Sequence, residues 1–251
     1  MIDVHCHILP AIDDGASDLT ESLALLRLAV ADGIKKMVAT PHINPGYFDN
    51  NRLSINTALA RLRLEVAQQQ IPIQLAAAAE IRVTADLMPA FEQGLLPILG
   101  HWQQQQVLLL EFPHSHIPPG SDKLMKWLLQ RGVVPMIAHP ERNRDVQSNP
   151  RLLQPLIQAG CLFQLTASSL LGDLGDRHQA CAEQLLQQRL FTVMATDSHN
   201  IQRRPPRLQA ACDRVRQLTD EHYATQLVLD HPAMLTAQLD FGVLSGGLAC
   251  P

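Results

Sequence analysis

The sequence predicts one α/β domain whose parallel strands close, or nearly close, into a barrel. Short β-type runs alternate with longer helical ones along most of the chain, and about seven such β/α units can be counted. The β-type runs are mostly apolar, which is typical of parallel strands buried on both faces. The 251 residues, 46% of them hydrophobic, suffice for one barrel-sized core. A doubly wound open sheet is the alternative.

The expected strands are short runs of aliphatic residues. In chain order they cover residues 1–5, 36–40, 74–81, 107–112, 134–139, 162–166 and 191–197. The run at 107–112 is the clearest, because it is continuously aliphatic from Val107 to Leu110. The run at 74–81 is ambiguous, because its alanines also suit a helix.

The first helix carries the strongest local signals. Asp18 is a predicted N-cap with Glu21 three residues later, and Gly33 is the predicted stop. Further helices are expected at 51–69, 124–130, 150–159, 178–188 and 207–218. Since no internal repeat or linker is evident, we expect a single domain over residues 1–251. Its tail, from about residue 236, carries no chemical signal.

Composition narrows the classes of function. The formal net charge is −4, which gives no basic excess that would favour nucleic acid. No apolar run approaches the roughly 18 residues of a membrane span, and the first residues do not resemble a signal peptide. We therefore expect a cytoplasmic protein without membrane insertion. The 5 cysteines form no CxxC pair, and none is followed by arginine six positions later, which argues against a disulfide framework and a cysteine-nucleophile phosphatase.

Side chains of metal-binding types recur at the ends of the predicted strands. In β/α folds the reactive groups lie at the carboxyl ends of strands. Nine candidates occur at or just after six of these ends: His5, His7, Asp14, His42, Glu80, Glu111, His139, Asp197 and His199. One such residue alone is usually structural, but so many at equivalent positions predict a metal site.

The residue types indicate the chemistry. Because strand side chains alternate, His5 and His7 should point to one side and Cys6 away from them, into the core. Imidazole and carboxylate ligands suit Mn, Fe, Zn or Co, and carboxylates can bridge two ions. Clustered divalent ions can bind both the attacking and the leaving oxygen of a phosphoester. The sequence therefore predicts a phosphoester hydrolase with two or three divalent metal ions.

Arginines follow two of the predicted ligands. Arg142 follows His139, and Arg203 and Arg204 follow His199. A guanidinium matches the oxygens of a phosphate bidentately, so these positions are candidate phosphate-binding residues. The alternative is a surface arginine that pairs with an acidic neighbour such as Glu141.

Together these motifs resemble a known family. They are Met1-Ile-Asp-Val-His-Cys-His with Asp13-Asp14-Gly15, then Thr40-Pro41-His42, Glu80, Glu111-Phe112, Ala138-His139-Pro140-Glu141-Arg142 and Thr196-Asp197-Ser198-His199-Asn200. This set resembles the PHP (polymerase and histidinol phosphatase) superfamily. More narrowly, the Asp-Asp-Gly and Arg-Arg-Pro-Pro segments resemble the bacterial manganese-dependent tyrosine-protein phosphatases encoded with capsule and exopolysaccharide genes. The match extends from residue 1 to about 206.

The resemblance implies a distorted (β/α)7 TIM-like barrel with a trinuclear site. One metal would be held by His5, His7, Glu80 and Asp197, a second by Glu80, Glu111 and His139, and a third by Asp14, His42 and His199. A metal-bound hydroxide would attack phosphorus, while Arg142 and Arg204 bind the phosphoryl oxygens. Manganese is the implied metal. Arg204 is preferred to Arg203 because it directly precedes Pro205-Pro206.

The resemblance also implies the substrate. It would be a phosphotyrosine protein, namely a bacterial tyrosine kinase that controls polysaccharide export. Two alternatives use the same scaffold: a small-molecule phosphatase of the histidinol-phosphatase type, and a phosphodiesterase. A metal-binding protein without catalysis is a third, which the complete ligand set disfavours.

Overall fold

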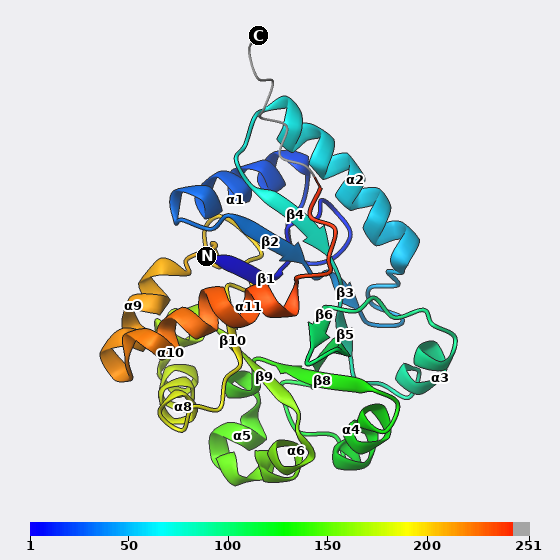
Figure 1. Cartoon of the computed structure of the whole chain (residues 1–251), viewed down its shortest axis with the longest axis vertical. Coiled ribbons are helices and arrows are strands. Elements are labelled where there is room, and N and C mark those ends of the chain that lie inside the picture. The colour runs from blue at the N-terminus through cyan, green and yellow to red at the C-terminus, as the bar shows by residue number, and fades with distance from the viewer. Residues whose placement is uncertain (243–251) are drawn as a thin grey trace.

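Parallel strands form a ring at the centre of the molecule (Figure 1). The structure, a computed structural model, describes residues 1–242. The strands are β1 (Ile2–Cys6), β2 (Lys36–Ala39), β3 (His42–Ile43), β4 (Gln74–Ala77), β5 (Glu80–Arg82), β7 (Gln105–Glu111), β8 (Val133–Ala138), β9 (Leu162–Thr166) and β10 (Val193–Ala195). Because β3 continues β2 and β5 continues β4, they occupy seven positions around the ring.

Two hydrogen-bonded sheets join to close this ring. One has the order β1-β2-β4 and the other the order β10-β9-β8-β7-β5-β3. Between β1 and the end of β10, the N–H of Asp197 donates to the carbonyl of His5 and the N–H of His7 to that of Ser198, both at 2.8 Å. The predicted barrel is confirmed, and the open-sheet alternative is wrong.

Helices in the connections and after the last strand surround the ring, and α11 contributes Leu235 to its interior. They are α1 (Leu19–Ala31), α2 (Arg52–Gln68), α3 (Leu87–Glu92), α4 (Ser121–Leu129), α5 (Arg144–Ser148), α6 (Gln154–Ala159), α7 (Ala167–Leu170), α8 (Asp176–Gln187), α9 (Gln209–Leu218), α10 (Glu221–Thr225) and α11 (His231–Leu235). Short turns of other helix types are η1 (Pro140–Arg142), η2 (Pro150–Leu153) and η3 (Gln226–Asp230). Among the described residues, no helix combines the length and the apolar character needed to cross a bilayer.

The main differences from the predicted elements have local causes. The helix expected at 150–159 begins as η2, because Pro150 supplies the first turn and Pro155 removes an amide donor from its middle. The strand expected at 74–81 is interrupted between β4 and β5. Residues 103–106, all glutamines, lie at a hairpin between β6 (Gly100–Trp102) and β7 that was not predicted, with Gln103 and Gln104 at positive φ.

The hydrophobic core has two layers. The outer layer packs the strands against the helices and includes large buried side chains such as Leu26, Leu62 and Phe163. The inner layer consists mainly of strand residues such as Leu109 and Ala195, together with Ala78 between β4 and β5. The pleat of β7 places Glu111 on the same face as Leu109, whereas Glu80 begins β5 and Asp197 follows the end of β10 at positive φ. Each of the three carboxylates thus comes two positions after a residue of the apolar interior.

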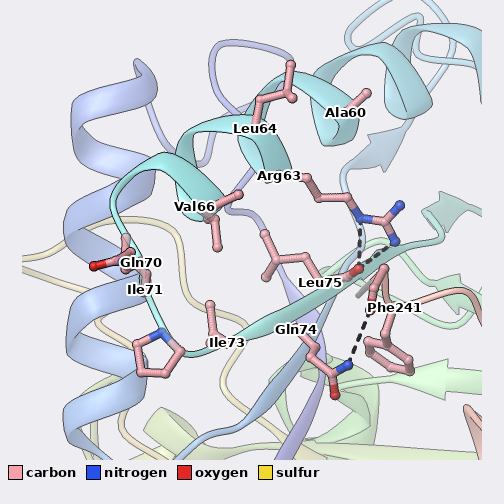
Figure 2. Close-up of a pocket in the computed structure, with 13 residues that line it drawn as sticks. Ala60, Arg63, Leu64, Val66, Gln70, Ile71, Ile73, Gln74, Leu75 and Phe241 are labelled. Atoms are coloured by element: carbon pink, nitrogen blue, oxygen red, sulfur yellow. Dashed lines mark hydrogen bonds between the residues drawn. The ribbon is translucent and has the colours of Figure 1, made fainter. Parts of the chain in front are cut away.

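The segment after α11 returns to the edge of the barrel. Arg63 of α2 donates to the carbonyl of Leu75 through Nε at 3.1 Å and Nη2 at 2.7 Å, and Gln74 Nε2 donates to the carbonyl of Gly242 at 3.3 Å (Figure 2). Phe241 lines the groove between α2 and β4. These contacts fix the last described residues against β4. The remainder of the predicted tail lies outside the described residues.

Candidate metal centre

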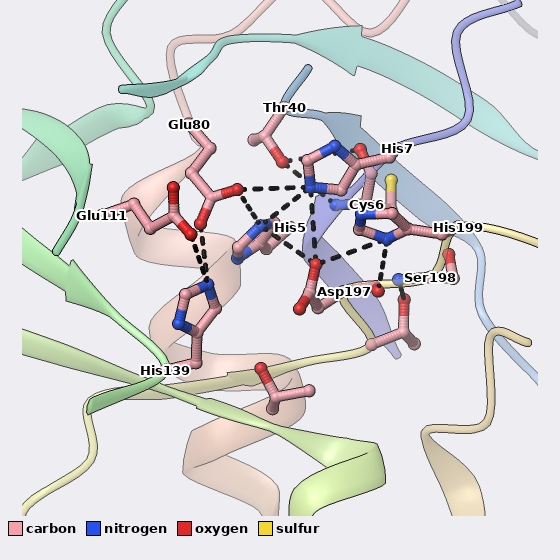
Figure 3. A network of polar contacts seen from close by, with 12 residues as sticks. His5, Cys6, His7, Thr40, Glu80, Glu111, His139, Asp197, Ser198 and His199 are labelled. Carbon is pink, nitrogen blue, oxygen red and sulfur yellow. Dashed lines mark hydrogen bonds and ion pairs between the residues drawn. The ribbon is translucent and has the colours of Figure 1, made fainter. Parts of the chain in front are cut away.

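All nine predicted ligand side chains come together at the carboxyl ends of the strands. Figure 3 shows seven of them, all except Asp14 and His42. Six of the seven ring positions contribute at least one of the nine. Every member is buried except His42, which is partly buried, and Asp14, whose side chain is 52% exposed. The barrel thus brings together groups from residue 5 to residue 199.

The first cluster consists of four ligand atoms around one point. His5 Nε2 and His7 Nε2 lie 3.2 Å apart. Glu80 Oε2 lies 3.3 Å from the first nitrogen and 3.4 Å from the second, and Asp197 Oδ1 lies 3.4 Å from both. This is the four-residue set that the family resemblance implied for one metal.

The hydrogen bonds of the two imidazoles show that this cluster fits a cation. His5 Nδ1 bonds the amide oxygen of Gln164 at 2.9 Å, and His7 Nδ1 bonds a carboxylate oxygen of Asp13 at 2.7 Å. Both partners are acceptors, because Gln164 Oε1 also accepts from the N–H of His139. In the neutral imidazoles the two Nε2 atoms therefore carry lone pairs, which face each other. A shared metal ion is the partner that both lone pairs fit.

Two further observations indicate that the first cluster favours a bound positive charge. Asp197 Oδ1 is buried without a hydrogen-bond partner in the described structure. Burial works against protonation of His5, but Glu80 and Asp197 outweigh it and raise the pKa of His5 above its ordinary value. The electrostatics thus favour a proton or a metal cation here.

The second cluster surrounds His139. Its Nε2 lies 2.8 Å from Glu80 Oε1 and 4.0 Å from Glu111 Oε1. Burial and the neighbouring Arg142 lower the pKa of His139 to about 3, so its imidazole is neutral near pH 7 and able to coordinate a metal. Burial and Glu80 raise the pKa of Glu111 to about 8, and within residues 1–242 Glu111 Oε2 has no hydrogen-bond partner, although Arg82 Nη1 lies 3.3 Å from it.

The third cluster lies at the open side of the site. Asp14 Oδ1 is 3.4 Å from His42 Nε2 and 3.4 Å from His199 Nε2. His199 Nδ1 donates to the carbonyl of Asp197 at 2.9 Å, which leaves Nε2 free toward Asp14. Burial and the nearby His7 lower the pKa of His199 to about 4, so this imidazole is also neutral near pH 7. The other nitrogen of His42, Nδ1, is 3.1 Å from Glu80, which links the third cluster to the first two.

Two of the nine residues have strained backbones. His139 has φ +31° and Asp197 has φ +51°, and each directly follows a strand or lies close to its end. Left-handed conformations of residues other than glycine are uncommon and concentrate at functional sites. Here they turn the two side chains into the cluster.

The Asp13-Asp14-Gly15 turn packs directly on His7. A Cβ atom at Gly15 would lie 2.1 Å from the carbonyl oxygen of His7, so only glycine fits. Ala16 N–H donates to that same carbonyl at 3.0 Å. The turn thus places Asp13 against Nδ1 of His7, and Asp14 near the Nε2 atoms of His42 and His199.

Both predicted arginines reach the site through Asp197. Arg142 Nη1 donates to Asp197 Oδ2 at 2.6 Å, and Arg204 Nη2 donates to the same oxygen. Burial opposes ionisation of Asp197, but Arg204 and His5 outweigh it and hold its pKa well below the ordinary value. Arg204 Nε is buried without a partner among the described residues, whereas the side chain of Arg203 is exposed.

Sequence reasoning missed four residues that border the clusters. Asp13 and Gln164 orient the imidazoles of His7 and His5, Arg82 lies 3.3 Å from Glu111 Oε2, and His114 Nε2 lies 3.6 Å from Glu111 Oε1. Gln164 gave no signal because it lies inside a strand rather than at its end. Asp13 was detectable as the neighbour of Asp14. Cys6 was predicted correctly: its buried Sγ donates to the carbonyl of Val38 in the core.

A Gln164→Met variant is expected to bind metal about 10- to 100-fold more weakly. Methionine keeps the volume but removes the acceptor that fixes the tautomer of His5. Metal titration of the metal-stripped protein would measure the loss. Gln158→Met, an exposed position on α6, is the control. Equal metal affinity of Gln164→Met and wild type would show that Gln164 is not needed to orient His5.

The fold and site define a class: a barrel hydrolase that depends on metal ions held by histidine and carboxylate side chains. The comparisons identify the family within that class. Residues 1–237 match the family model described as capsular polysaccharide synthesis, CpsB/CapC, so the chain belongs to that family. The family resemblance stated from the motifs is confirmed.

Individual relatives and solved structures agree with this family assignment. The tyrosine-protein phosphatase YwqE of Bacillus subtilis is 37% identical over 204 residues, which is 81% of this chain and 79% of the relative. CpsB of Streptococcus pneumoniae, also a tyrosine-protein phosphatase, is 29% identical over 241 residues, 92% of this chain and 96% of the relative.

A crystal structure from work on YwqE and CpsB, described as metal-dependent tyrosine phosphatases, matches with a TM-score of 0.88 and 33% identity over 95% of each chain. The organophosphorus hydrolase of Deinococcus radiodurans matches with a TM-score of 0.54 and 15% identity, over 96% of this chain and 92% of that one, which shows a shared fold alone.

Proposed function

We propose that this chain is a metal-dependent protein-tyrosine phosphatase of capsular polysaccharide synthesis. One observation carries the proposal: three His/carboxylate clusters and two arginines converge on one point in a chain whose relatives are tyrosine-protein phosphatases. The reaction is hydrolysis of a phosphate monoester. Water is the acceptor of the phosphoryl group, and tyrosine is released.

The ligand sets follow the three clusters. His5, His7, Glu80 and Asp197 would hold one ion, Glu80, Glu111 and His139 a second, and Asp14, His42 and His199 a third. When bound, the divalent ions supply positive charge to the phosphoryl oxygens and make water nucleophilic at neutral pH. Manganese is the metal we expect, while iron, zinc and cobalt suit the same nitrogen and oxygen donors.

The arginines bind and orient the phosphoryl group. Asp197 Oδ2 anchors one terminal nitrogen of each guanidinium, which fixes the planes of both Arg142 and Arg204. Their remaining N–H groups, among them the unpaired Nε of Arg204, are available to phosphoryl oxygens. Because these donors are preorganised, they stabilise the charge that develops on the oxygens during transfer.

The surroundings of the site suit a phosphotyrosine side chain. Phe48 stacks on His42 with ring centroids 5.5 Å apart, and Tyr47 beside it is 82% exposed. Since Asp14 is also half exposed, a residue of a protein chain can reach the clusters. The substrate we expect is a phosphorylated bacterial tyrosine kinase of polysaccharide export, which agrees with the cytoplasmic location expected from the sequence.

Phosphate release from a phosphotyrosine peptide tests the function. Metal-stripped protein should release no phosphate, and added Mn²⁺ should restore release. Histidinol phosphate and a phosphodiester serve as competing substrates in the same assay. If the metal-loaded, folded protein hydrolyses either of these and not the peptide, the tyrosine-directed proposal is wrong.

Thiol alkylation is expected to leave the activity intact. All four cysteines among the described residues are buried, and burial raises the pKa of Cys161 and of Cys181 to about 12. These thiols are therefore protonated at pH 8 and react slowly with iodoacetamide. Residual activity should be compared with that of a cysteine-dependent tyrosine phosphatase treated in parallel. Inactivation that keeps pace with alkylation of one described cysteine would count against the metal mechanism.

A further inference from the structure

A second cavity opens beside the phosphoryl-binding arginines. It has a volume of about 830 Å³ and lies between α5 and α8, with His114 and Arg142 at its border. Its other polar side chains include Arg144, Arg177 and His178. We refer to the space bounded by these five residues as the basic cavity.

Two of the three arginines that line the basic cavity, Arg144 and Arg177, carry positive charge that no acidic side chain among residues 1–242 compensates, whereas Arg142 is paired with Asp197. Among the described residues, no aspartate or glutamate lines the cavity. The acidic groups nearby are engaged elsewhere: Glu183 of α8 pairs with Arg214 at 2.6 Å, Asp173 pairs with Arg207, and Asp145 accepts from the N–H of Ile117 at 3.0 Å.

The two outer arginines are free to bind. Arg144 and Arg177 are exposed, and neither guanidinium has an ion-pair partner within residues 1–242. Burial and Arg142 lower the pKa of His114 to about 4, and burial and Arg142 also lower the pKa of His178. The uncompensated charge therefore comes from Arg144 and Arg177, since Arg142 is paired with Asp197, whereas the histidines add neutral hydrogen-bonding groups.

The cavity is continuous with the reaction site. Arg142 belongs to both, since it lines the cavity and donates to Asp197 at 2.6 Å. His114 also belongs to both, because its Nε2 is 3.6 Å from Glu111. An extended peptide advances by about 3.3–3.6 Å per residue. A residue a few positions from the phosphotyrosine would thus lie over Arg144 and Arg177.

From this placement we infer that the basic cavity binds a second anionic side chain of the phosphotyrosine substrate, either a carboxylate or another phosphate. The inference rests on the proposed phosphatase function and narrows its substrate to chains with anionic groups near the target tyrosine. Planar guanidinium groups suit both anions, because each presents paired oxygens.

Peptide kinetics test the inference. Three kinds of phosphotyrosine peptide are needed. The first has only neutral residues next to the phosphotyrosine. The second carries one glutamate, placed in turn at each position from three residues before the phosphotyrosine to three after it, and the third carries the non-hydrolysable phosphonomethyl-phenylalanine at the same positions. For the wild type we expect about 3- to 10-fold lower KM for the best anionic peptides than for the neutral one, with similar kcat, and a smaller ratio at high salt.

The double variant Arg144→Gln/Arg177→Gln should bring this KM ratio close to one. Arg61→Gln, an exposed arginine on α2, should keep the wild-type ratio. If the ratio of the KM for the neutral peptide to the KM for the anionic peptide is larger in the phosphonate series than in the glutamate series, the cavity prefers a second phosphotyrosine. If the two ratios are equal, the cavity accepts a carboxylate as well as a phosphate.

Two results would overturn the inference. If the wild type hydrolyses neutral and anionic peptides with equal KM, or if the double variant keeps the preference, the cavity is not a substrate subsite, although the phosphatase function stands. If the metal-loaded wild type hydrolyses no phosphotyrosine peptide, both the function and the subsite are wrong.

Discussion

A Glu80→Gln variant is expected to lose about three orders of magnitude in turnover and part of its bound metal. Glu80 is the residue that connects the clusters: Oε2 lies within 3.4 Å of His5, His7 and His42, and Oε1 lies 2.8 Å from His139. Glutamine keeps the size but removes the charge that would bridge two ions. The measurements are kcat on a phosphotyrosine peptide and metal content by elemental mass spectrometry.

Glu92→Gln is the matched control, since Glu92 is exposed at the end of α3. It should keep both activity and metal content. Circular dichroism would verify that Glu80→Gln retains the fold. Full metal occupancy and turnover in Glu80→Gln would contradict the bridging role.

An Arg204→Ala variant should lose about 10²- to 10³-fold in kcat while its metal content stays at the wild-type level. The guanidinium donates to Asp197 Oδ2, whereas the first cluster contains Asp197 Oδ1, so removal of the guanidinium should leave the ligand atoms in place. It does remove donors for the phosphoryl oxygens. We therefore expect a lower kcat and weaker inhibition by inorganic phosphate.

The neighbouring Arg203 provides the control for this prediction. Its side chain is exposed, so Arg203→Ala should behave as wild type. If Arg204→Ala lost metal together with activity, the residue would be a structural support of Asp197. Equal losses in the two variants would show that the activity depends on the segment as a whole and not on the guanidinium of Arg204.

Most of the barrel was predictable from the sequence, because the pattern of apolar residues differs between the two kinds of element: buried parallel strands are short continuous apolar runs, whereas amphipathic helices repeat their apolar residues every three or four positions. β9 (Leu162–Thr166) agrees with the predicted range at both ends. The short helices α3, α5, α7 and α10 were not predictable, because one or two turns are too short to show a period. The closing contact between Asp197 and His5 joins positions 192 residues apart, a distance that no local pattern can indicate.

The nine ligand candidates were predictable because they occupy equivalent places in successive β/α units. What the sequence could not give is their order in space. That Glu80 lies between His5 and His139, and that both arginines share one oxygen of Asp197, depends on the twist and closure of the sheet. Gln164 was missed because a buried glutamine within a strand resembles any other polar interruption.

The ring closes only when the strand that ends before Asp197 pairs with the first strand of the chain. During synthesis the first 140 residues already carry seven of the nine donors, but Asp197 and His199 are still missing. A nascent chain in which Asp197 and His199 have not yet emerged from the exit tunnel therefore cannot complete either the first or the third cluster. Full metal loading must follow the emergence of these two ligands, so catalysis by the complete site is expected only after them.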